Sequence, residues 1–320
     1  MRFFSEDSFW NQPLGADVEA DPSSERLIEL MDERQGAMYI NCERYTIPVY
    51  LADASTPLRR IYQRGPDEGA TGRQLDRQKR YRQHPDFGPE IPIPADAVPD
   101  PDGDAHMAIV DLERRMAWDM WYVRIRPDGE YESATGMVYS LESDGVWRTE
   151  DFPIEDGESM HFHGPSRAAG VPAIAGLILE EEIRAGRIAH KLAFASNPAC
   201  QEFVWPATWT DGAQEEGPRE GCIIQLDPEL DLDAFDLTPG SRTIARALQE
   251  YGAVTVDGAG GNVVYAEGLY GHPGRSWEGV LDPNDLRCIP LRHYRILKME
   301  GVVCKGDGFH AETRRLRSKG

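Results

Sequence analysis

Two histidines one residue apart, His161 and His163, stand in a chain that has only eight histidines. On a strand, side chains at i and i+2 share a face, so both rings would point the same way. Such a pair is a common beginning of a metal site, and it also suits acid–base chemistry. A metal needs further ligands, for which Asp104, His106 and His190 are the candidates. We expect no cofactor, with a divalent metal at His161 and His163 as the alternative.

Asp104 and His106, in the stretch GDAHMAIVD, have the same i, i+2 spacing. This spacing places a carboxylate and an imidazole on one face of a strand or of the turn before it. The pair suits a general base held by an acid, or two metal ligands. The alternative is a turn aspartate followed by a histidine at a strand edge. Asp257, in VTVDGAG, is a further candidate, although an aspartate before Gly258 can simply make a turn.

The stretch AWDMWYVRI places Asp119 and Trp121 on one face of a predicted strand. A carboxylate beside an aromatic ring is typical of sugar sites: the ring stacks on the pyranose, and the acid binds hydroxyl groups or protonates a leaving oxygen. Burial of the tryptophans in the core is the alternative. The predicted catalytic residues are Asp104, His106, Asp119, His163 and Asp257, and the predicted substrate-binding residues are Trp121, Arg124, Tyr139, Glu142, Arg167 and His190. For His190, a buried, hydrogen-bonded histidine is the favoured interpretation.

Strands are the main elements that would position these residues. Residues 104–150 alternate between apolar and polar with a period of two and are interrupted by turns, which predicts antiparallel strands. Further strands are expected within 189–196, 201–209 and 253–260. Helices are expected over 21–36, 179–188 and 239–252, the first ended by Gly36 and the last capped near Thr238 or Ser241. Many short strands without regular strand–helix alternation predict a mainly β fold, an antiparallel β-sandwich or jelly roll with a few short helices.

The chain is long enough for one large domain. We expect a single β-rich domain over residues 1–320, with an N-terminal helical extension over about residues 1–40. Residues 63–103 are rich in proline, glycine and charge, which predicts a long irregular loop over the surface. Whether that loop covers a substrate stays open.

Composition excludes several classes of function. The net charge of −21 argues against nucleic acid as the main partner, because phosphate binding needs a basic surface. No apolar run is long enough to cross a membrane, and the first residues lack the apolar stretch of a secretory signal. We therefore expect a chain that is cytoplasmic or is supplied without its leader, in an oligomeric state that the sequence leaves open. No nucleotide-binding loop or serine-hydrolase motif is present.

Several segments, taken in order, carry a resemblance to a known group of proteins. They are SFWNQPL (8–14), DAHMAIVDLERRMAWDMW (104–121), AAGVPAIAGLILEEEIRAGRIAHKLAFAS (168–196), FVWPAT (203–208) and ARALQEYGAVTVDG (245–258). The chain resembles a widespread, mostly uncharacterised bacterial group with an FN-P box, a D-x-H strand, a G-I-x-H-A-L-x-F segment, V-W-P-A and A-L-x-x-Y-G. Its members resemble secreted, carbohydrate-active, jelly-roll-like proteins. The resemblance therefore implies a carbohydrate as the partner.

These observations predict a carbohydrate-active enzyme that cleaves glycosidic bonds of a polysaccharide or oligosaccharide. A glycoside hydrolase would use two carboxylates, Asp119 with Asp104, Glu142 or Asp257. The acidic composition disfavours a polyanionic substrate, which places hydrolysis of a neutral glycan slightly ahead.

A polysaccharide lyase is the second mechanism. It would use His163 or His106 as the base, with Arg124 or Arg167 neutralising a uronic carboxylate and a tyrosine such as Tyr139 protonating the leaving oxygen. Two alternatives from other classes stay open: a non-catalytic carbohydrate-binding or structural jelly-roll protein, and a cupin-like metal-dependent enzyme that uses the His161 and His163 pair.

Overall fold

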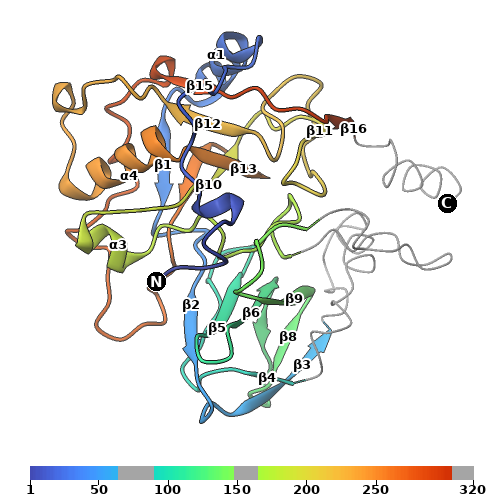
Figure 1. Cartoon of the computed structure of the whole chain (residues 1–320). Helices are drawn as coiled ribbons and strands as arrows, with labels where there is room; N and C mark the ends of the chain where they lie inside the picture. Colours follow the sequence, from blue (N-terminus) through green and yellow to red (C-terminus); the bar gives the residue numbers. More distant parts are fainter. Residues whose placement is uncertain (64–89, 148–164, 305–320) are drawn as a thin grey trace, which may run out of the picture.

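A computed structural model describes residues 1–63, 90–147 and 165–304 of the chain (Figure 1). The predicted histidine pair, His161 and His163, lies outside the described residues, as does most of the expected loop over 63–103. Strands make up most of the regular structure, so the predicted mainly β class is confirmed. Among the described residues, no helix combines the length and the apolar character needed to cross a membrane.

The strands form three larger sheets and one short pair. The six-stranded sheet has the order β1 (Met38–Asn41), β14 (Asn262–Tyr265), β10 (Leu192–Ser196), β13 (Ala253–Gly258), β12 (Ile223–Leu226), β15 (Tyr294–Ile296). The central sheet has the order β2 (Val49–Ala52), β5 (Met107–Asp111), β6 (Met116–Trp121), β9 (Thr135–Ser140). The outer sheet has the order β4 (Glu90–Pro92), β3 (Leu58–Gln63), β8 (Tyr131–Ser133), β7 (Arg124–Ile125), and β11 (Glu202–Phe203) pairs with β16 (Val303–Cys304).

Apolar clusters separate these layers. One cluster, which includes Phe194, lies between the six-stranded sheet and the helices α1 (Ser24–Gln35) and α4 (Pro239–Glu250). A second, which includes Ala195 and Val110, lies between the six-stranded and central sheets. A third, which includes Ile109, lies between the central and outer sheets. Because the central sheet is covered on both faces, every residue of β5 is buried.

The sheets are mixed, whereas the sequence predicted antiparallel strands. The neighbouring strands β5, β6 and β9 do pair antiparallel, as the alternation over 104–150 predicted. The pairs β1–β14, β10–β13, β2–β5 and β3–β8 are parallel. Each of these parallel pairs joins strands that are far apart in sequence. A period of two reports which side chains share a face, but it does not report which distant strand becomes the partner.

The helices form where the sequence places them. In α1, Ser23 is the N-cap and Gly36 follows the last turn. In α4, the Thr238 hydroxyl accepts a hydrogen bond from Ser241 N at 3.1 Å, which satisfies one of the free amide groups at the helix start. The third described helix, α3 (Glu180–Ala185), lies within the expected range 179–188. Since α1 packs on the six-stranded sheet and β1 belongs to it, the N-terminal segment is part of the core.

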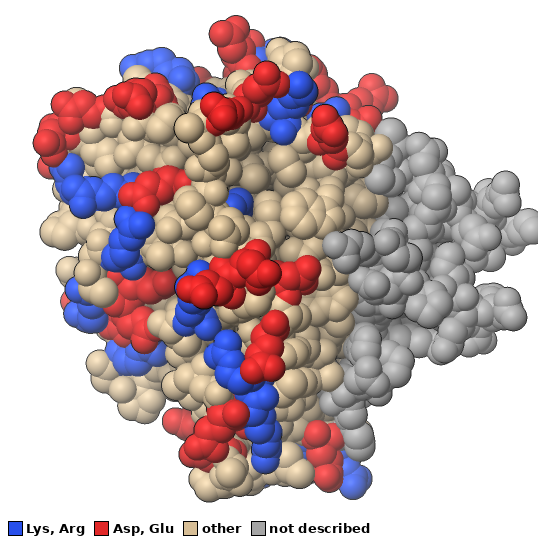
Figure 2. Space-filling model, in the orientation of Figure 1, with Lys and Arg blue, Asp and Glu red and all other residues tan. Residues whose placement is uncertain are grey.

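Charged side chains of both signs are interspersed on the face drawn in Figure 2, where lysine and arginine lie beside aspartate and glutamate. The described residues also form ion pairs between exposed or partly exposed side chains, such as Arg187 with Glu250, at 2.8 Å, and Arg242 with Asp233, at 2.7 Å. The acidic excess of the chain therefore does not form a field of one sign on this face.

Candidate functional site

The segment that follows residue 165 is held in place by Asp119 of β6. Asp119 is fully buried, and its carboxylate accepts hydrogen bonds from Ala173 N at 2.7 Å, Ser166 N at 3.2 Å and the Tyr139 hydroxyl at 3.2 Å. Burial raises the pKa of Asp119 to about 7, although these hydrogen bonds lower it. Asp119 thus joins the central sheet to the segment that carries Arg167.

Arg167 lies completely buried between the six-stranded and central sheets. Its Nη2 donates to Ala173 O at a long 3.4 Å, and its Cζ lies 3.9 Å from the ring centroid of Tyr265, at the end of β14. Among the described residues, its Nε and Nη1 are buried without a hydrogen-bond partner. A buried guanidinium with unmet donors is costly, so these two atoms mark Arg167 as a candidate site residue.

Asp257 lies close enough to Arg167 to be affected by its charge, and β13, which carries Asp257, is irregular. Phe194 pairs with Thr255 but the next residue, Ala195, pairs with Asp257, so Val256 is an extra residue that forms a β-bulge. Bulges redirect side chains and are frequent beside active sites. The Tyr265 hydroxyl donates to Asp257 Oδ2 at 3.4 Å.

The pKa of Asp257 is raised well above its ordinary value. Burial is the first cause, followed by the neighbouring carboxylates of Asp211 and Asp104, while Arg167 lowers it. The side chain keeps some exposed surface, which moderates the effect of burial, but the neighbouring charges act in the same direction. Asp257 is therefore a carboxyl group that keeps its proton to a higher pH than an ordinary aspartate does.

A second carboxyl pair lies against Asp257. Glu220 is fully buried, and neither of its oxygens has a partner when the group is ionised. Burial, followed by the charge of Asp211 and a hydrogen bond to it, raises the pKa of Glu220 well above its ordinary value. Asp211 also accepts from Gly258 N at 3.0 Å. A protonated Glu220 that donates to Asp211 satisfies both groups, because two carboxylates in contact need a shared proton.

His106, directly before β5, is 5% exposed, and its Nε2 has no hydrogen-bond partner in the part of the chain that the structure describes. Burial lowers its pKa to about 4; Asp104 and the Ser166 backbone raise it, and Arg167 lowers it. The ring is therefore neutral at pH 7, with one buried nitrogen free to exchange a proton.

Asp104 is half-buried at the rim of the cluster, beside an aromatic pair. Trp121 Nε1 lies 3.5 Å from Asp104 Oδ1, and the Trp121 ring stacks on Tyr122 with centroids 5.2 Å apart. Ala105 and Tyr122 have φ values of 42° and 60°, a region that non-glycine residues rarely adopt, and Val123 N donates to Ala105 O at 3.0 Å beside them. Backbone strain of this kind concentrates at functional sites.

We call this group the Arg167 cluster. Its members come from the segments before β5 and after residue 165, from the loop before β12, and from β13 and β14; they are Asp104, His106, Arg167, Asp211, Glu220, Asp257 and Tyr265. Among them are the predicted residues Asp104, His106, Arg167 and Asp257. Trp121 borders the cluster, while Asp119 and Tyr139 lie behind it.

Other predicted residues lie elsewhere. Arg124, in the outer sheet, pairs with Glu132 through Nε at 2.6 Å, and Glu142 is exposed on a turn after β9. His190 is partly buried, and its ring nitrogens form hydrogen bonds with Lys191 O at 2.8 Å and Glu182 Oε2 at 3.1 Å, which agrees with the hydrogen-bonded part of its favoured interpretation. Burial lowers the pKa of His190, but its hydrogen bond and charge pair with Glu182 outweigh this and raise it overall.

Sequence reasoning did not single out Asp211, Glu220 or Tyr265. Asp211 precedes Gly212 and resembles an ordinary turn residue, and Glu220 stands among many acidic residues of an acidic chain. The only signal for Tyr265 is its place on a buried strand. A tyrosine that merely packs in the core would have the same place, so this signal does not indicate a function.

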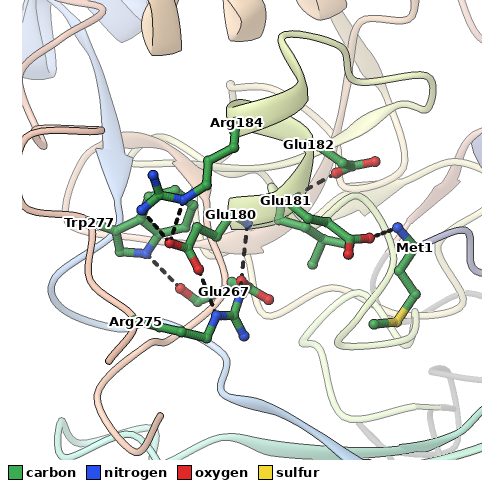
Figure 3. A network of polar contacts seen from close by, with 9 residues as sticks. Met1, Glu180, Glu181, Glu182, Arg184, Glu267, Arg275 and Trp277 are labelled. Atoms are coloured by element: carbon green, nitrogen blue, oxygen red, sulfur yellow. Dashed lines mark hydrogen bonds and ion pairs between the residues drawn. The ribbon is translucent and has the colours of Figure 1, made fainter. Parts of the chain in front are cut away.

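A wide cavity of about 1060 Å³ opens elsewhere, beside α3, and a neighbouring cavity of about 470 Å³ shares Arg184, His272 and Arg275 with it. Figure 3 shows the polar network there. Arg275 Nε donates to Glu180 at 2.6 Å and pairs with Glu267, and Arg184 lies 2.7 Å from Glu180. The arginines of this network are already paired with carboxylates, and neither cavity is lined by a predicted site residue that the structure describes. We therefore take the Arg167 cluster as the candidate functional site.

Within the described residues, no three histidine, cysteine, aspartate or glutamate side chains are arranged to hold a metal ion. Comparison with protein-family models gave no match, and comparisons with curated proteins and with solved structures gave none either. The fold and site define a mainly β protein with a buried cluster of acid–base groups between two sheets.

Proposed function

We propose that the protein is a carbohydrate-active enzyme that cleaves glycosidic bonds of a polysaccharide or oligosaccharide, by hydrolysis in the first instance. One observation carries the proposal: Asp104 and Asp257 lie close enough for the charge of one to raise the pKa of the other. Two carboxyl groups in unlike environments are the requirement for glycoside hydrolysis, in which one donates a proton and the other stays ionised.

In this mechanism Asp257 protonates the leaving oxygen of the glycosidic bond. Asp104 acts on the other side, either by activating water or by attacking the sugar carbon, and the separation of the two carboxyl groups in the complex sets the stereochemical outcome. Asp119, expected as one of the two carboxylates, instead fits a positioning role, because its oxygens are occupied by Ser166, Ala173 and Tyr139.

A polysaccharide lyase is the second candidate, favoured by the unpaired atoms of Arg167 and His106. Neutral His106 would take the proton beside a uronic carboxylate, and Arg167 would stabilise the charge that develops. The electron pair would form a double bond in the sugar as the glycosidic bond breaks, and Tyr265 would give its proton to the leaving oxygen. Burial, and next Asp257, raise the pKa of Tyr265 well above its ordinary value, which keeps it a proton donor.

The jelly-roll or sandwich type of architecture stays a prediction, as does the carbohydrate partner itself. A non-catalytic carbohydrate-binding protein remains the alternative from another class. A buried cluster of acid–base groups favours an enzyme over that alternative, because a binding protein gains nothing from carboxyl groups with strongly raised pKa values.

A screen of neutral and uronic polysaccharides tests the proposal, with new reducing ends and absorbance of unsaturated uronates both recorded. Reducing ends without absorbance would establish hydrolysis, and both signals together would establish a lyase. Asp257→Asn should lower the activity at least about 100-fold, whereas Asp233→Asn, in an exposed ion pair with Arg242, should leave it unchanged. Binding without cleavage of every glycan would instead support the non-catalytic alternative.

A further inference from the structure

The Arg167 cluster holds two hydrogen-bond donors that have no acceptor among the described residues, the N–H groups of Arg167 Nε and Nη1. Burial and neighbouring carboxylates raise the pKa of both Glu220 and Asp257, which favours the protonated form of each carboxyl group. Glu220 can donate to Asp211, and the Tyr265 hydroxyl already donates to Asp257. The guanidinium is left without an oxygen acceptor for two of its nitrogens, and a carboxylate is the ligand group that such donors bind most strongly.

The missing acceptor is not supplied by the nearby side chains. Arg167 lowers the pKa of Asp257 through its charge alone, and no hydrogen bond or ion pair joins it to a carboxylate among the described residues. Instead it faces the aromatic ring of Tyr265 on one side. A folded protein that buries a guanidinium in this way gains most when a ligand brings the counter-charge.

We infer that the Arg167 cluster binds the carboxylate of a uronic acid residue, so that the glycan that the enzyme cleaves is acidic at the reacting sugar. This inference rests on the proposed function for the sugar part of the ligand. Asp104 and Asp257 are partly exposed, whereas Arg167 is fully buried, and the charges of Asp104 and Arg167 both act on Asp257. A uronic carboxylate would therefore approach the guanidinium from the side of these two partly exposed groups.

The carboxyl groups of the cluster select a singly charged ligand. A protonated Asp257 can donate a hydrogen bond to the ligand carboxylate. A phosphate group would bring more negative charge next to the four carboxyl groups of the cluster, Asp104, Asp211, Glu220 and Asp257. A sulfate group would accept a proton less readily than a carboxylate does. The net negative charge of the chain slows the approach of a polyanion. It does not change the interaction of one ligand carboxylate with the charged groups next to Arg167.

Titration of the full-length wild-type protein with glucuronate and galacturonate, followed by calorimetry, tests the inference directly. Glucose, galactose, glucose 6-sulfate and inorganic phosphate serve as probes of the other chemistries. We expect the uronates to bind about 10- to 100-fold more tightly than the neutral sugars, as charge-assisted hydrogen bonds would give. Equal binding of uronates and neutral sugars, or tighter binding of the sulfated sugar or of phosphate, would overturn it.

Arg167→Gln should reduce uronate affinity to that of the neutral sugar, whereas Arg187→Gln, in an exposed ion pair with Glu250, should not. Because Arg167 is buried, the wild-type protein supplies a second measurement that needs no variant. Uronate affinity, measured from pH 5.5 to pH 8, should fall with rising pH, because ionisation of Asp257, whose pKa is raised, adds a negative charge that repels the ligand. Unchanged affinity over that range would contradict the inference.

The two proposals can fail separately. Uronate binding without cleavage of any glycan would keep the carboxylate site and reject the enzyme. Cleavage of neutral glycans that glucuronate does not inhibit would keep the enzyme and reject the carboxylate site.

Discussion

The guanidinium of Arg167 lies over the ring of Tyr265, with the Arg167 Cζ 3.9 Å from the ring centroid. The two residues come from segments nearly 100 positions apart in the sequence, and the same tyrosine donates a hydrogen bond to Asp257 at 3.4 Å. Two parts of the Tyr265 side chain therefore make different contacts: the ring face stabilises a buried cation, and the hydroxyl contacts the proposed acid.

Two substitutions of Tyr265 distinguish the contribution of its ring face from that of its hydroxyl. Tyr265→Phe keeps the ring face and removes the hydroxyl, so it should lower the free energy of unfolding by only about 1 kcal/mol. Tyr265→Leu also removes the cation–π contact and should lower it by about 3 kcal/mol. Urea denaturation followed by tryptophan fluorescence measures both. Equal losses in the two variants would show that the ring face does not stabilise Arg167.

Asp119 should make the protein less stable as the pH rises. Its pKa is about 7 in the folded chain and near 4 in an unfolded one, so the folded state binds the extra proton between these values. The contribution of Asp119 to the free energy of unfolding is therefore largest below pH 4 and is lost as the pH rises through 7.

Asp119→Asn removes this titration. From pH 4 to pH 7, the free energy of unfolding of the wild type should therefore fall relative to that of the variant. Urea denaturation at a series of pH values measures it. A constant difference over that range would mean that Asp119 stays ionised. Asp119→Ala should cost about 3 kcal/mol at pH 7, because it leaves the amides of Ser166 and Ala173 without an acceptor, and more at lower pH, where the protonated Asp119 contributes most.

Gly221 should be the glycine on which the placement of Glu220 depends. It has φ of +90°, and a Cβ at this position would lie 1.8 Å from Val204 O. Gly221→Ala should destabilise the fold by about 3 kcal/mol or more, since both the backbone conformation and the space forbid it.

Gly274→Ala is the matched control, because Gly274 has a similar φ of +77° with nothing within 4 Å of the added Cβ. Its cost should be only the conformational one, about 1 kcal/mol. Thermal unfolding of the two variants side by side measures the difference, and similar melting temperatures would contradict the clash at Gly221.

Activity should fall on the alkaline side as Asp257 loses its proton. In hydrolysis the acid must be protonated, so kcat/KM decreases as the pH rises through the raised pKa of Asp257. Asp211→Asn removes a charge that raises this pKa and should move the alkaline limb to lower pH, while its amide oxygen can still accept from Gly258 N. A pH–rate profile of both proteins measures the shift; an unmoved limb would assign the acid to another group.

Local features of the fold could be predicted because they depend on neighbouring residues. The cap at Thr238, the stop at Gly36 and the antiparallel order of β5, β6 and β9 all follow from patterns within a few residues. The adjacency of Asp104 and His106 on one segment was visible for the same reason.

The sequence by itself determined a mainly β chain, the places of its described helices and the acid–imidazole spacing before β5. The tertiary structure alone decided that β10 lies parallel to β13, that the bulge at Val256 turns Asp257 toward Asp211, and that Glu220 and Tyr265 join them. The physical reason is that apolar periodicity fixes which face of a strand is buried, whereas the pairing of distant strands depends on packing of the whole core. The Arg167 cluster, whose residues come from such strands and the segments beside them, exists only once that packing is complete.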